Sequence, residues 1–366
     1  MVIQMPITSR CNSRCVTCNV WKHHERIDID DTALKECLKD PFFSEVKSVG
    51  LNGGEFSLVP RFKEILDALD SLPKLKYVYL ISNGLAGQRI KEYTEYAKHY
   101  LSAKGIRVSL CISIDGIGEV HDKIRGIEGN FTRSKHLIED ILKDSDKYCD
   151  QLTIGHTLSR FNIARVYELD AIESLFNIPI DIHLAVPNKR IGTFTDADRY
   201  DVLADEETRQ LAAEFFFSRF LKAESYHLKA RYYANYYYLS HNGKGRLSNC
   251  FYRFRDITID ENLNMSLCAT ASESLGNLKG ESASILAKSK RAKKEVRRLK
   301  KECCNRCIHY SYYPLTVRGR FLFAREVVKQ QNSMQAYKSF CQKRTPITSS
   351  LATLKKIVKI AVKYDY

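Results

Sequence analysis

Short runs of apolar and β-branched residues alternate with longer segments whose apolar residues recur at helical spacing over the first half of the chain. This alternation is typical of repeated β/α units that form a parallel sheet. We predict six strands, at residues 2–8, 46–52, 76–82, 107–114, 151–158 and 179–186. The expected fold class is α/β: a partial (β/α)6 barrel similar to a TIM barrel, spanning residues 1–195, followed by a small α+β domain. In such a barrel, functional residues gather at the C-terminal ends of the strands.

The pattern changes after residue 195. We predict a helical, tyrosine-rich connection at 196–245, a small cysteine-containing domain of short strands at 246–310 and a basic helical tail at 311–366. Tyrosines in the connection can pack helices together or form a platform for a substrate. In the tail, apolar residues and lysines recur at helical intervals, which predicts a basic amphipathic helix. Such a helix can make peripheral contact with an anionic membrane, although packing on its own domain is commoner.

The composition is that of an ordinary globular protein. Of the 366 residues, 44% are hydrophobic and 28% are charged. The sequence shows no export signal and no apolar run long enough to span a membrane, so a cytoplasmic location is expected. The formal net charge of +15 favours acidic partners in general, and much of it lies between Lys288 and Lys301, where a solvated helix face is the simpler explanation.

Three of the twelve cysteines stand directly after the first predicted strand. Cys11, Cys15 and Cys18 are spaced CxxxCxxC, which suits three irons of a [4Fe–4S] cluster and leaves the fourth iron open to a small molecule. A structural zinc ion is the alternative, since His23 or His24 could supply a fourth ligand. An open iron beside a polar loop is a reactive site, and it makes an enzyme the leading hypothesis.

Polar motifs follow the next three predicted strands. They are Asn52-Gly53-Gly54-Glu55, Ser82-Asn83-Gly84 and Ser113-Ile114-Asp115-Gly116. Paired glycines let backbone carbonyls approach a ligand amine, and Glu55 can accept a hydrogen bond from it. Ser113 and Asp115 share one face of a strand, and both can bind a ribose or another polyol.

Together and in this order, the motifs resemble those of the radical S-adenosylmethionine (SAM) superfamily over most of residues 3–190. The resemblance implies that the cluster on Cys11, Cys15 and Cys18 chelates SAM through its open iron. It implies that Gly53, Gly54 and Glu55 hold the SAM amino group, and that Ser113 and Asp115 lie near the ribose, with Asn83 and Arg160 as weaker contacts. Thr17 and Phe56 replace the family's usual aromatic residue and proline, and neither change removes a ligand.

The same resemblance implies a reaction. An electron, supplied by a flavodoxin or ferredoxin type of donor, cleaves SAM to a 5′-deoxyadenosyl radical, which takes a hydrogen atom from the substrate. The cofactor carries this chemistry, while the protein positions it and excludes water.

A second set of cysteines lies in the later segment. Cys250 and Cys268 precede Cys303-Cys304-Asn305-Arg306-Cys307, and the set resembles the auxiliary-cluster domain of the same superfamily in its short, twitch form rather than the longer SPASM form. The resemblance implies an auxiliary [4Fe–4S] cluster on Cys250, Cys268, Cys304 and Cys307. Zinc is the alternative, because four thiolates also form a tetrahedral zinc site, and Cys303 could replace Cys304.

An auxiliary cluster favours net oxidation, which also needs a base. Asp181 and His183 alternate with apolar residues on the sixth predicted strand, so both are expected to point into the barrel, as a catalytic pair or as a structural one. His121, Asp122 and Arg125, just beyond the fourth strand, could contact cofactor or substrate.

Three functional hypotheses follow. The first is oxidation of a carbohydrate or another small polar metabolite. The second is maturation of a peptide or protein by a crosslink, thioether or epimerisation. The third, from another class, is a non-catalytic, metal-stabilised protein that binds nucleic acid through its basic surface, although no stable nucleic-acid complex is expected.

Overall fold

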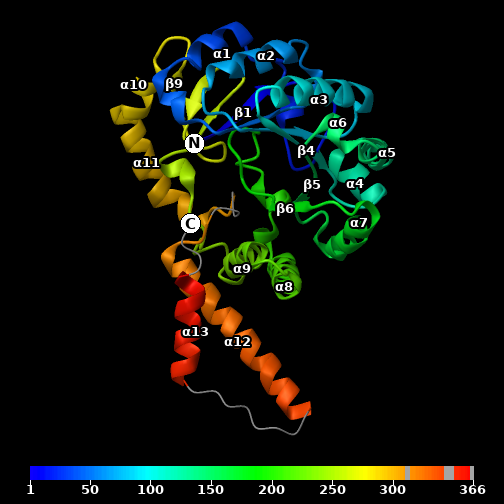
Figure 1. Ribbon diagram of the computed structural model, residues 1–366, viewed down its shortest axis with the longest axis vertical. Coiled ribbons are helices and arrows are strands. Elements are labelled where there is room, and N and C mark those ends of the chain that lie inside the picture. The colour runs from blue at the N-terminus through cyan, green and yellow to red at the C-terminus, as the bar shows by residue number, and fades with distance from the viewer. Residues whose placement is uncertain (310–313, 342–349, 363–366) are drawn as a thin grey trace. The chain divides into compact units, whose positions relative to one another are not determined.

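The computed structural model describes the backbone of residues 1–309, 314–341 and 350–362, and the side chains of 1–309, 314–334 and 356–362 (Figure 1). Contacts divide the chain into two compact units. The first unit combines Met1–Thr208 with Tyr252–Cys303, and the second combines Arg209–Phe251 with Cys304–Tyr366. These boundaries differ from the four segments expected from the sequence, which stay a prediction.

Six parallel strands form the barrel sheet of the first unit, and they follow one another in chain order. They are β1 (Val2–Thr8), β2 (Ser48–Gly53), β3 (Tyr77–Ser82), β4 (Arg107–Ser113), β5 (Gln151–Leu158) and β6 (Ile180–Leu184). Every neighbouring pair is parallel. The predicted α/β partial barrel is therefore confirmed, and the C-terminal ends of all six strands meet at one edge.

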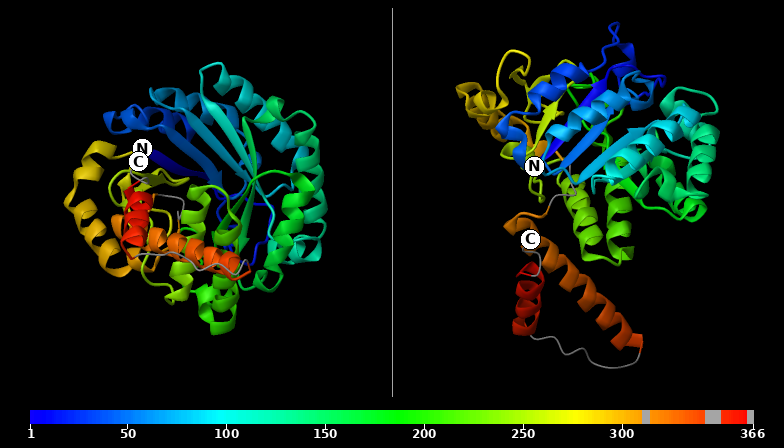
Figure 2. Two further views of the ribbon diagram at one scale, coloured as in Figure 1. Left: turned by 60° about the horizontal axis from the view of Figure 1, so that its bottom comes forward. Right: turned by 45° about the horizontal axis from the view of Figure 1, so that its top comes forward.

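Helices cover the outer face of this curved sheet (Figure 2). They are α1 (Asp31–Cys37), α2 (Phe62–Ala68), α3 (Gly87–Ser102), α4 (Glu119–Arg125), α5 (Asn130–Leu142), α6 (Ser145–Tyr148) and α7 (Leu169–Phe176). In α3, the buried residues Ile90, Thr94, Ala97 and Leu101 recur every three or four positions, which makes one continuous inward stripe. These stripes bury the apolar strand residues that point outward from the barrel, such as Val78, Leu80, Val108 and Leu110.

Three short strands extend the same sheet beyond β1. They are β7 (Ile257–Ile259), β8 (Asn264–Ser266) and β9 (Ser274–Asn277). Ile3 of β1 pairs in parallel with Ile257, and β7, β8 and β9 then pair antiparallel. Two helices follow, α10 (Ala283–Lys288) and α11 (Lys290–Glu302). A segment more than 200 residues after β1 thus extends the barrel sheet at its β1 edge.

The second unit is helical. Its main elements are α9 (Tyr226–Ser240), α12 (Val317–Cys341), α13 (Ser350–Val362) and most of α8 (Glu206–Lys222). The Tyr233 ring lies 5.6 Å from that of Phe220 and 5.8 Å from that of Phe323, so this tyrosine joins three helices. No helix in the described part of the chain is long and apolar enough to cross a membrane.

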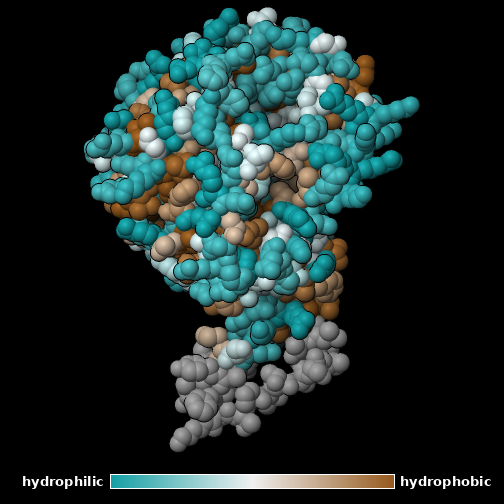
Figure 3. All heavy atoms as spheres, turned by 180° about the vertical axis from the view of Figure 1, so that it is seen from behind, coloured by the Kyte–Doolittle hydropathy of each residue, from teal (hydrophilic) through white to brown (hydrophobic). Residues whose placement is uncertain are grey.

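The predicted basic amphipathic tail corresponds to α13. Lys356 and Lys359 are exposed and Ala361 is buried, whereas the side chains of Leu351, Leu354 and Lys363 lie outside the described residues. Peripheral membrane contact through this helix therefore stays a prediction. Elsewhere, hydrophilic residues cover most of the face seen in Figure 3.

Candidate active site

The cysteine loop starts where β1 ends and is fixed from two sides. On one side, the Ser9 amide donates to the Ile27 carbonyl at 2.8 Å. On the other, the amides of Arg14 and Val16 donate to the carbonyls of Arg125 and Ile124, both at 2.8 Å. The backbone carbonyls in the last turn of α4 therefore fix the position of the cysteine loop.

Gly126, directly after α4, permits this close approach of the cysteine loop to the helix. Its φ is +67°, in the left-handed region, and a Cβ there would lie 2.5 Å from the Arg14 carbonyl oxygen. A side chain at this position would push the cysteine loop away from α4.

The paired glycines at the end of β2 bring that strand against the same loop. Gly53 has a φ of +134°, and a Cβ on Gly54 would lie 1.9 Å from the Arg10 carbonyl oxygen. The amides of Gly54 and Glu55 donate to the carbonyls of Thr8 and Arg10, both at 2.7 Å. From the sequence, these glycines are expected to let a ligand approach, which stays a prediction; in the structure they permit the close approach of β1 and the cysteine loop.

Glu55 is held by donors from the protein. Its Oε1 accepts from the hydroxyls of Ser57 at 2.8 Å and Ser82 at 2.9 Å, and its Oε2 accepts from the Asn83 amide at 2.8 Å. Burial raises the pKa of this carboxyl, and the hydrogen bonds oppose the increase. Glu55 thus ties the end of β2 to the end of β3.

Asn83 continues the connection into the cysteine loop. Its Nδ2 donates to the Asn12 side-chain oxygen at 2.8 Å and lies 3.8 Å from the Cys11 sulfur. The ends of the second, third and first strands are therefore connected beside Cys11. Their roles toward SAM stay a prediction.

Asp115, after β4, is buried in an ion pair. Its Oδ2 lies 2.7 Å from Nε of Arg125, and its Oδ1 accepts from the Thr157 amide at 2.8 Å. Burial alone would raise the pKa of Asp115, but the positive charge of Arg125 keeps it below its usual value. Ser113 precedes Asp115 by two residues, at the end of β4, and keeps 8% of its surface exposed.

Arg125 connects this ion pair to the cysteines. Its Nη1 donates toward the Cys15 sulfur at 3.8 Å, and Ser13 Oγ lies 3.2 Å from the same sulfur. A buried guanidinium is always charged, so it places a fixed positive charge beside the Cys15 sulfur. This role of Arg125 was not predictable from the sequence, because strand and helix periodicity carry no information on which ion pairs form.

His121 and Asp122, which were predicted together with Arg125 as possible contacts of cofactor or substrate, accept hydrogen bonds from backbone amides. His121 Nδ1 accepts from the Asp115 amide at 2.9 Å, and burial, with Arg125, lowers the pKa of His121 to about 4. The Asp122 carboxylate accepts from the amides of Gly129 and Phe131, both at 2.7 Å.

The inner face of the barrel is lined by polar and small residues. Asp181 Oδ2 and His183 Nε2 lie 2.8 Å apart on β6, with about a third of each side chain exposed (38% and 33%). Asp181 lies beside Gly155 of the neighbouring strand β5, and His183 lies beside Thr157 of the same strand. The predicted inward pair thus exists as a hydrogen-bonded pair, and its catalytic role stays a prediction.

The inner face carries a further polar group that was not predicted from the sequence. Gln4 of β1 donates to the Tyr79 hydroxyl and accepts from the Asn52 amide, the latter at 2.9 Å. The sequence feature that indicates this group is the polar residue Gln4 in the middle of β1, between the apolar residues Ile3 and Met5, which are fully buried.

Arg160 is committed to another segment. Its guanidinium pairs with Asp205 at 2.8 Å and donates to the Asp198 carbonyl at 2.8 Å. Its predicted contact with the cofactor stays a prediction.

The three loop cysteines supply thiols, the type of donor that an iron–sulfur cluster requires. Burial raises the pKa of Cys11 to about 11 and that of Cys18 to about 12, and the Cys15 thiol adds to both increases. His23 and His24, the alternative zinc ligands, are exposed. Among the described residues, no three His, Cys, Asp or Glu side chains surround a position for a single metal ion.

The cysteines of the second set belong to different units. In the first unit, burial raises the pKa of Cys303 and the nearby Cys268 adds to this shift. In the second unit, Arg246 donates to the carbonyls of Cys307 at 3.1 Å and Asn249 at 2.8 Å, which holds the segments of Cys307 and Cys250 side by side. The auxiliary cluster on Cys250, Cys268, Cys304 and Cys307 stays a prediction.

Comparison with known families decides the identity of the barrel. The model of the Radical SAM superfamily matches residues 5–169. Residues 5–169 form a radical SAM domain. Radical SAM domains bind a [4Fe–4S] cluster and SAM, so the cofactors expected from the resemblance are confirmed for this barrel, with three thiols that fit them.

Curated relatives share only part of this chain. The sporulation killing factor maturation protein SkfB of Bacillus subtilis is 29% identical over 156 residues, 42% of this chain and 35% of SkfB. The GTP 3′,8-cyclase of Clostridium perfringens is 26% identical over 188 residues, 49% of this chain and 53% of the cyclase. The match thus spans about a third to a half of the length of these relatives.

A solved structure shares the fold over nearly the whole length. Native anSMEcpe with bound AdoMet and Kp18Cys peptide is 14% identical, with a TM-score of 0.58 and coverage of 99% of both chains. At this identity the likeness concerns the fold alone.

Proposed function

We propose that this protein is a radical SAM enzyme that modifies a peptide or protein substrate. The observation that carries the enzymatic part is the convergence of the cysteine loop, the Gly53-Gly54-Glu55 turn and the Asp115–Arg125 pair at one edge of the barrel. When bound, the cluster and SAM supply a radical that removes a hydrogen atom from the substrate. The inner face of the barrel offers the substrate polar groups, including the Asp181–His183 pair.

The peptide substrate is supported by the comparisons. SkfB is named as a maturation protein, and the anSMEcpe structure that matches along the full chain contains a peptide. A small polar metabolite is the second candidate, favoured by the similarity to GTP 3′,8-cyclase. Because superfamily members are enzymes, both replace the non-catalytic nucleic-acid hypothesis.

The proposed reaction also needs an electron acceptor for the substrate radical and an electron donor for SAM cleavage. A second [4Fe–4S] cluster in a SPASM- or twitch-like region would accept an electron from the substrate radical, which makes the enzyme an oxidoreductase. A flavodoxin or ferredoxin would supply the electron for SAM cleavage. A reducing, cytoplasmic setting suits this proposal because clustered cysteines bind iron only as reduced thiolates.

The test uses the reconstituted protein, SAM and a reductant with two panels, synthetic peptides encoded near its gene and nucleotides or sugars. Mass spectrometry of each candidate measures modification. We expect a peptide to change mass in step with 5′-deoxyadenosine release. Modification of a nucleotide or sugar, with every peptide unchanged, would contradict the peptide assignment.

A further inference from the structure

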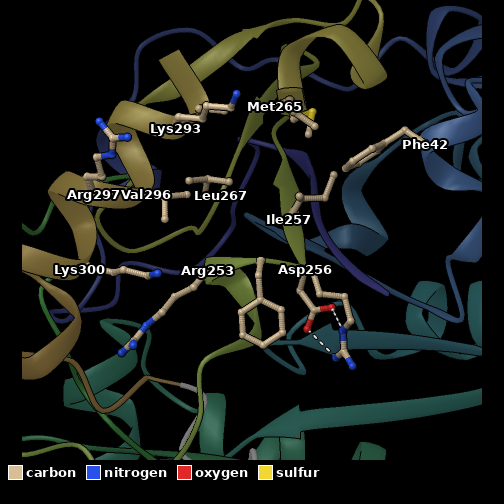
Figure 4. A pocket seen from close by; sticks show the side chains of 14 residues that line it. Phe42, Arg253, Asp256, Ile257, Met265, Leu267, Lys293, Val296, Arg297 and Lys300 are labelled. Atoms are coloured by element: carbon tan, nitrogen blue, oxygen red, sulfur yellow. Dashed lines mark hydrogen bonds and ion pairs between the residues drawn. The ribbon is translucent and has the colours of Figure 1, made fainter. Parts of the chain in front are cut away.

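A cavity of about 400 Å³ opens in the first unit, away from the cysteine loop. It lies between α11 and the added strands β7 and β8 (Figure 4). Asp256 and Ile257, on its wall, contact Val2 and pair with Ile3 at the start of β1, whereas the cysteine loop follows the end of β1. A seven-residue strand separates the two by ~20 Å. The cavity is therefore distinct from the candidate active site.

The floor of this cavity is apolar. It is formed by the side chains of Phe42, Ile257, Met265, Leu267 and Val296, and Phe254 at the wall keeps 71% of its surface exposed. The volume lies within the range of small-ligand sites and can take one or two large apolar side chains. An exposed aromatic residue beside an open apolar floor is typical of a binding surface.

One wall is strongly basic. Lys293, Arg297 and Lys300 of α11 line it at intervals of four and three residues, so they form one row along the helix. The two glutamates of that helix face elsewhere, because Glu295 and Glu302 both pair with Arg298. In the described part of the chain, these three cations have no carboxylate partner.

The single acidic residue among those lining the cavity is already neutralised. Both oxygens of Asp256 accept from the Arg255 guanidinium, at 2.7 and 2.9 Å, and the Val2 amide donates to one of them at 2.9 Å. The cavity thus combines an apolar floor with uncompensated positive charge, which is complementary to a ligand that is both apolar and anionic.

The spacing of the charges selects the kind of anion. Three cations spread over ~10 Å of helix suit carboxylates distributed along an extended chain, where alternate side chains on one face are ~7 Å apart. A single phosphate group would need donors that converge on one point. We propose that this cavity binds an acidic peptide segment that carries an apolar anchor residue. The proposal rests on the proposed function, with this segment lying outside the reacting part of the peptide substrate.

The test is a binding measurement that needs no turnover. Fluorescence anisotropy of the reconstituted protein follows a fluorescein-labelled peptide with glutamates on both sides of a Leu-Phe pair. Two comparison peptides replace Leu-Phe by Ser-Ser or the glutamates by lysines, and phosphatidylglycerol vesicles form a fourth arm. We expect the first peptide to bind best.

Two charge reversals on α11 provide the decisive comparison. Lys293→Glu/Lys300→Glu alters the cavity wall, while Lys294→Glu/Lys301→Glu makes the same change in charge, at the same seven-residue spacing, on a neighbouring face outside the cavity. All four lysines are exposed, so both variants are expected to fold. The first pair should weaken binding about tenfold or more, and the second about threefold or less.

Equal losses from both pairs, equal binding of the Ser-Ser peptide, or binding of vesicles without binding of the peptide would each overturn the proposal. So would the absence of peptide binding. Since no reductant is present, this result is independent of whether a peptide is modified, which is measured separately by mass.

Discussion

Arg125 is the residue on which two parts of the site depend. It compensates the buried charge of Asp115, and it reaches the sulfur of Cys15. The resemblance to the superfamily implies that Asp115 lies near a ribose, and this role stays a prediction. The structure shows its carboxylate turned to a cation ten residues further along the chain, a pairing that no local periodicity reveals.

Replacement of Arg125 tests this compensation. Arg125→Met leaves a buried carboxylate unpaired, so we expect the free energy of unfolding at pH 7 to fall by about 3–5 kcal/mol. Without the guanidinium, the folded-state pKa of Asp115 rises above its unfolded value, so the deficit should shrink as the pH falls and the carboxyl takes up a proton. Urea denaturation over pH 4 to 8 measures both effects.

The double variant Arg125→Met/Asp115→Asn is the control. It removes both charges, and it should recover most of the lost stability. A single variant that costs less than about 1 kcal/mol would show that the pair does not act as a buried one.

Gly54 is the second residue with a sharp expectation. In Gly54→Ala the new Cβ would lie 1.9 Å from the Arg10 carbonyl oxygen, so the start of the cysteine loop must move. We expect the iron content after reconstitution to fall from about eight toward about four irons per chain, because only the cluster on this loop is affected, with far-UV circular dichroism unchanged. Gly87→Ala is the matched control, because its Cβ would meet only Leu137 Cδ1 at 3.9 Å. Equal iron content in both variants would contradict the close approach.

At the scale of elements, the six parallel strands and the presence of short strands after residue 246 were predictable, whereas the addition of those short strands to the barrel sheet was not. The predicted first strand, residues 2–8, coincides with β1, since each long β/α unit carries its own hydrophobic pattern. β7 and β8 have three residues each, too few for a pattern, and the pairing of Ile257 with Ile3 joins positions far apart in sequence. The position of the motifs at one edge of the sheet was predictable, because each motif directly follows the end of a predicted strand.

Asp40 fastens the added segment to the barrel. It accepts hydrogen bonds from the hydroxyls of Ser282 at 2.5 Å and Ser284 at 2.6 Å, and from the Phe42 amide at 2.8 Å. Burial opposes ionisation, but these hydrogen bonds lower the pKa of Asp40 to about 2. A depressed carboxyl pKa stabilises the fold above the unfolded value, near 4, and this stabilisation is lost as the pH falls toward 2.

We therefore expect Asp40→Ala to be less stable than wild type at pH 6, with the difference shrinking between pH 4 and 2. Thermal unfolding across this range is the measurement. Because the donors are hydroxyls and an amide, the difference should persist in about 0.5 M salt. A difference that salt removes, or that stays constant with pH, would contradict this account. Asp140, whose lowered pKa comes from Lys143 and Lys91, is the salt-sensitive comparison.

At the scale of the whole molecule, the central claim is that the loop of Cys11, Cys15 and Cys18 binds the cluster that cleaves SAM. The direct measurement is iron and sulfide content after anaerobic reconstitution, with 5′-deoxyadenosine release under reductant in the same samples. Wild type is compared with the Cys11→Ala/Cys15→Ala/Cys18→Ala variant. We predict about eight irons in wild type, about four in the variant, and 5′-deoxyadenosine from wild type alone. Equal release by the variant, or none from an iron-loaded wild type, would contradict the account.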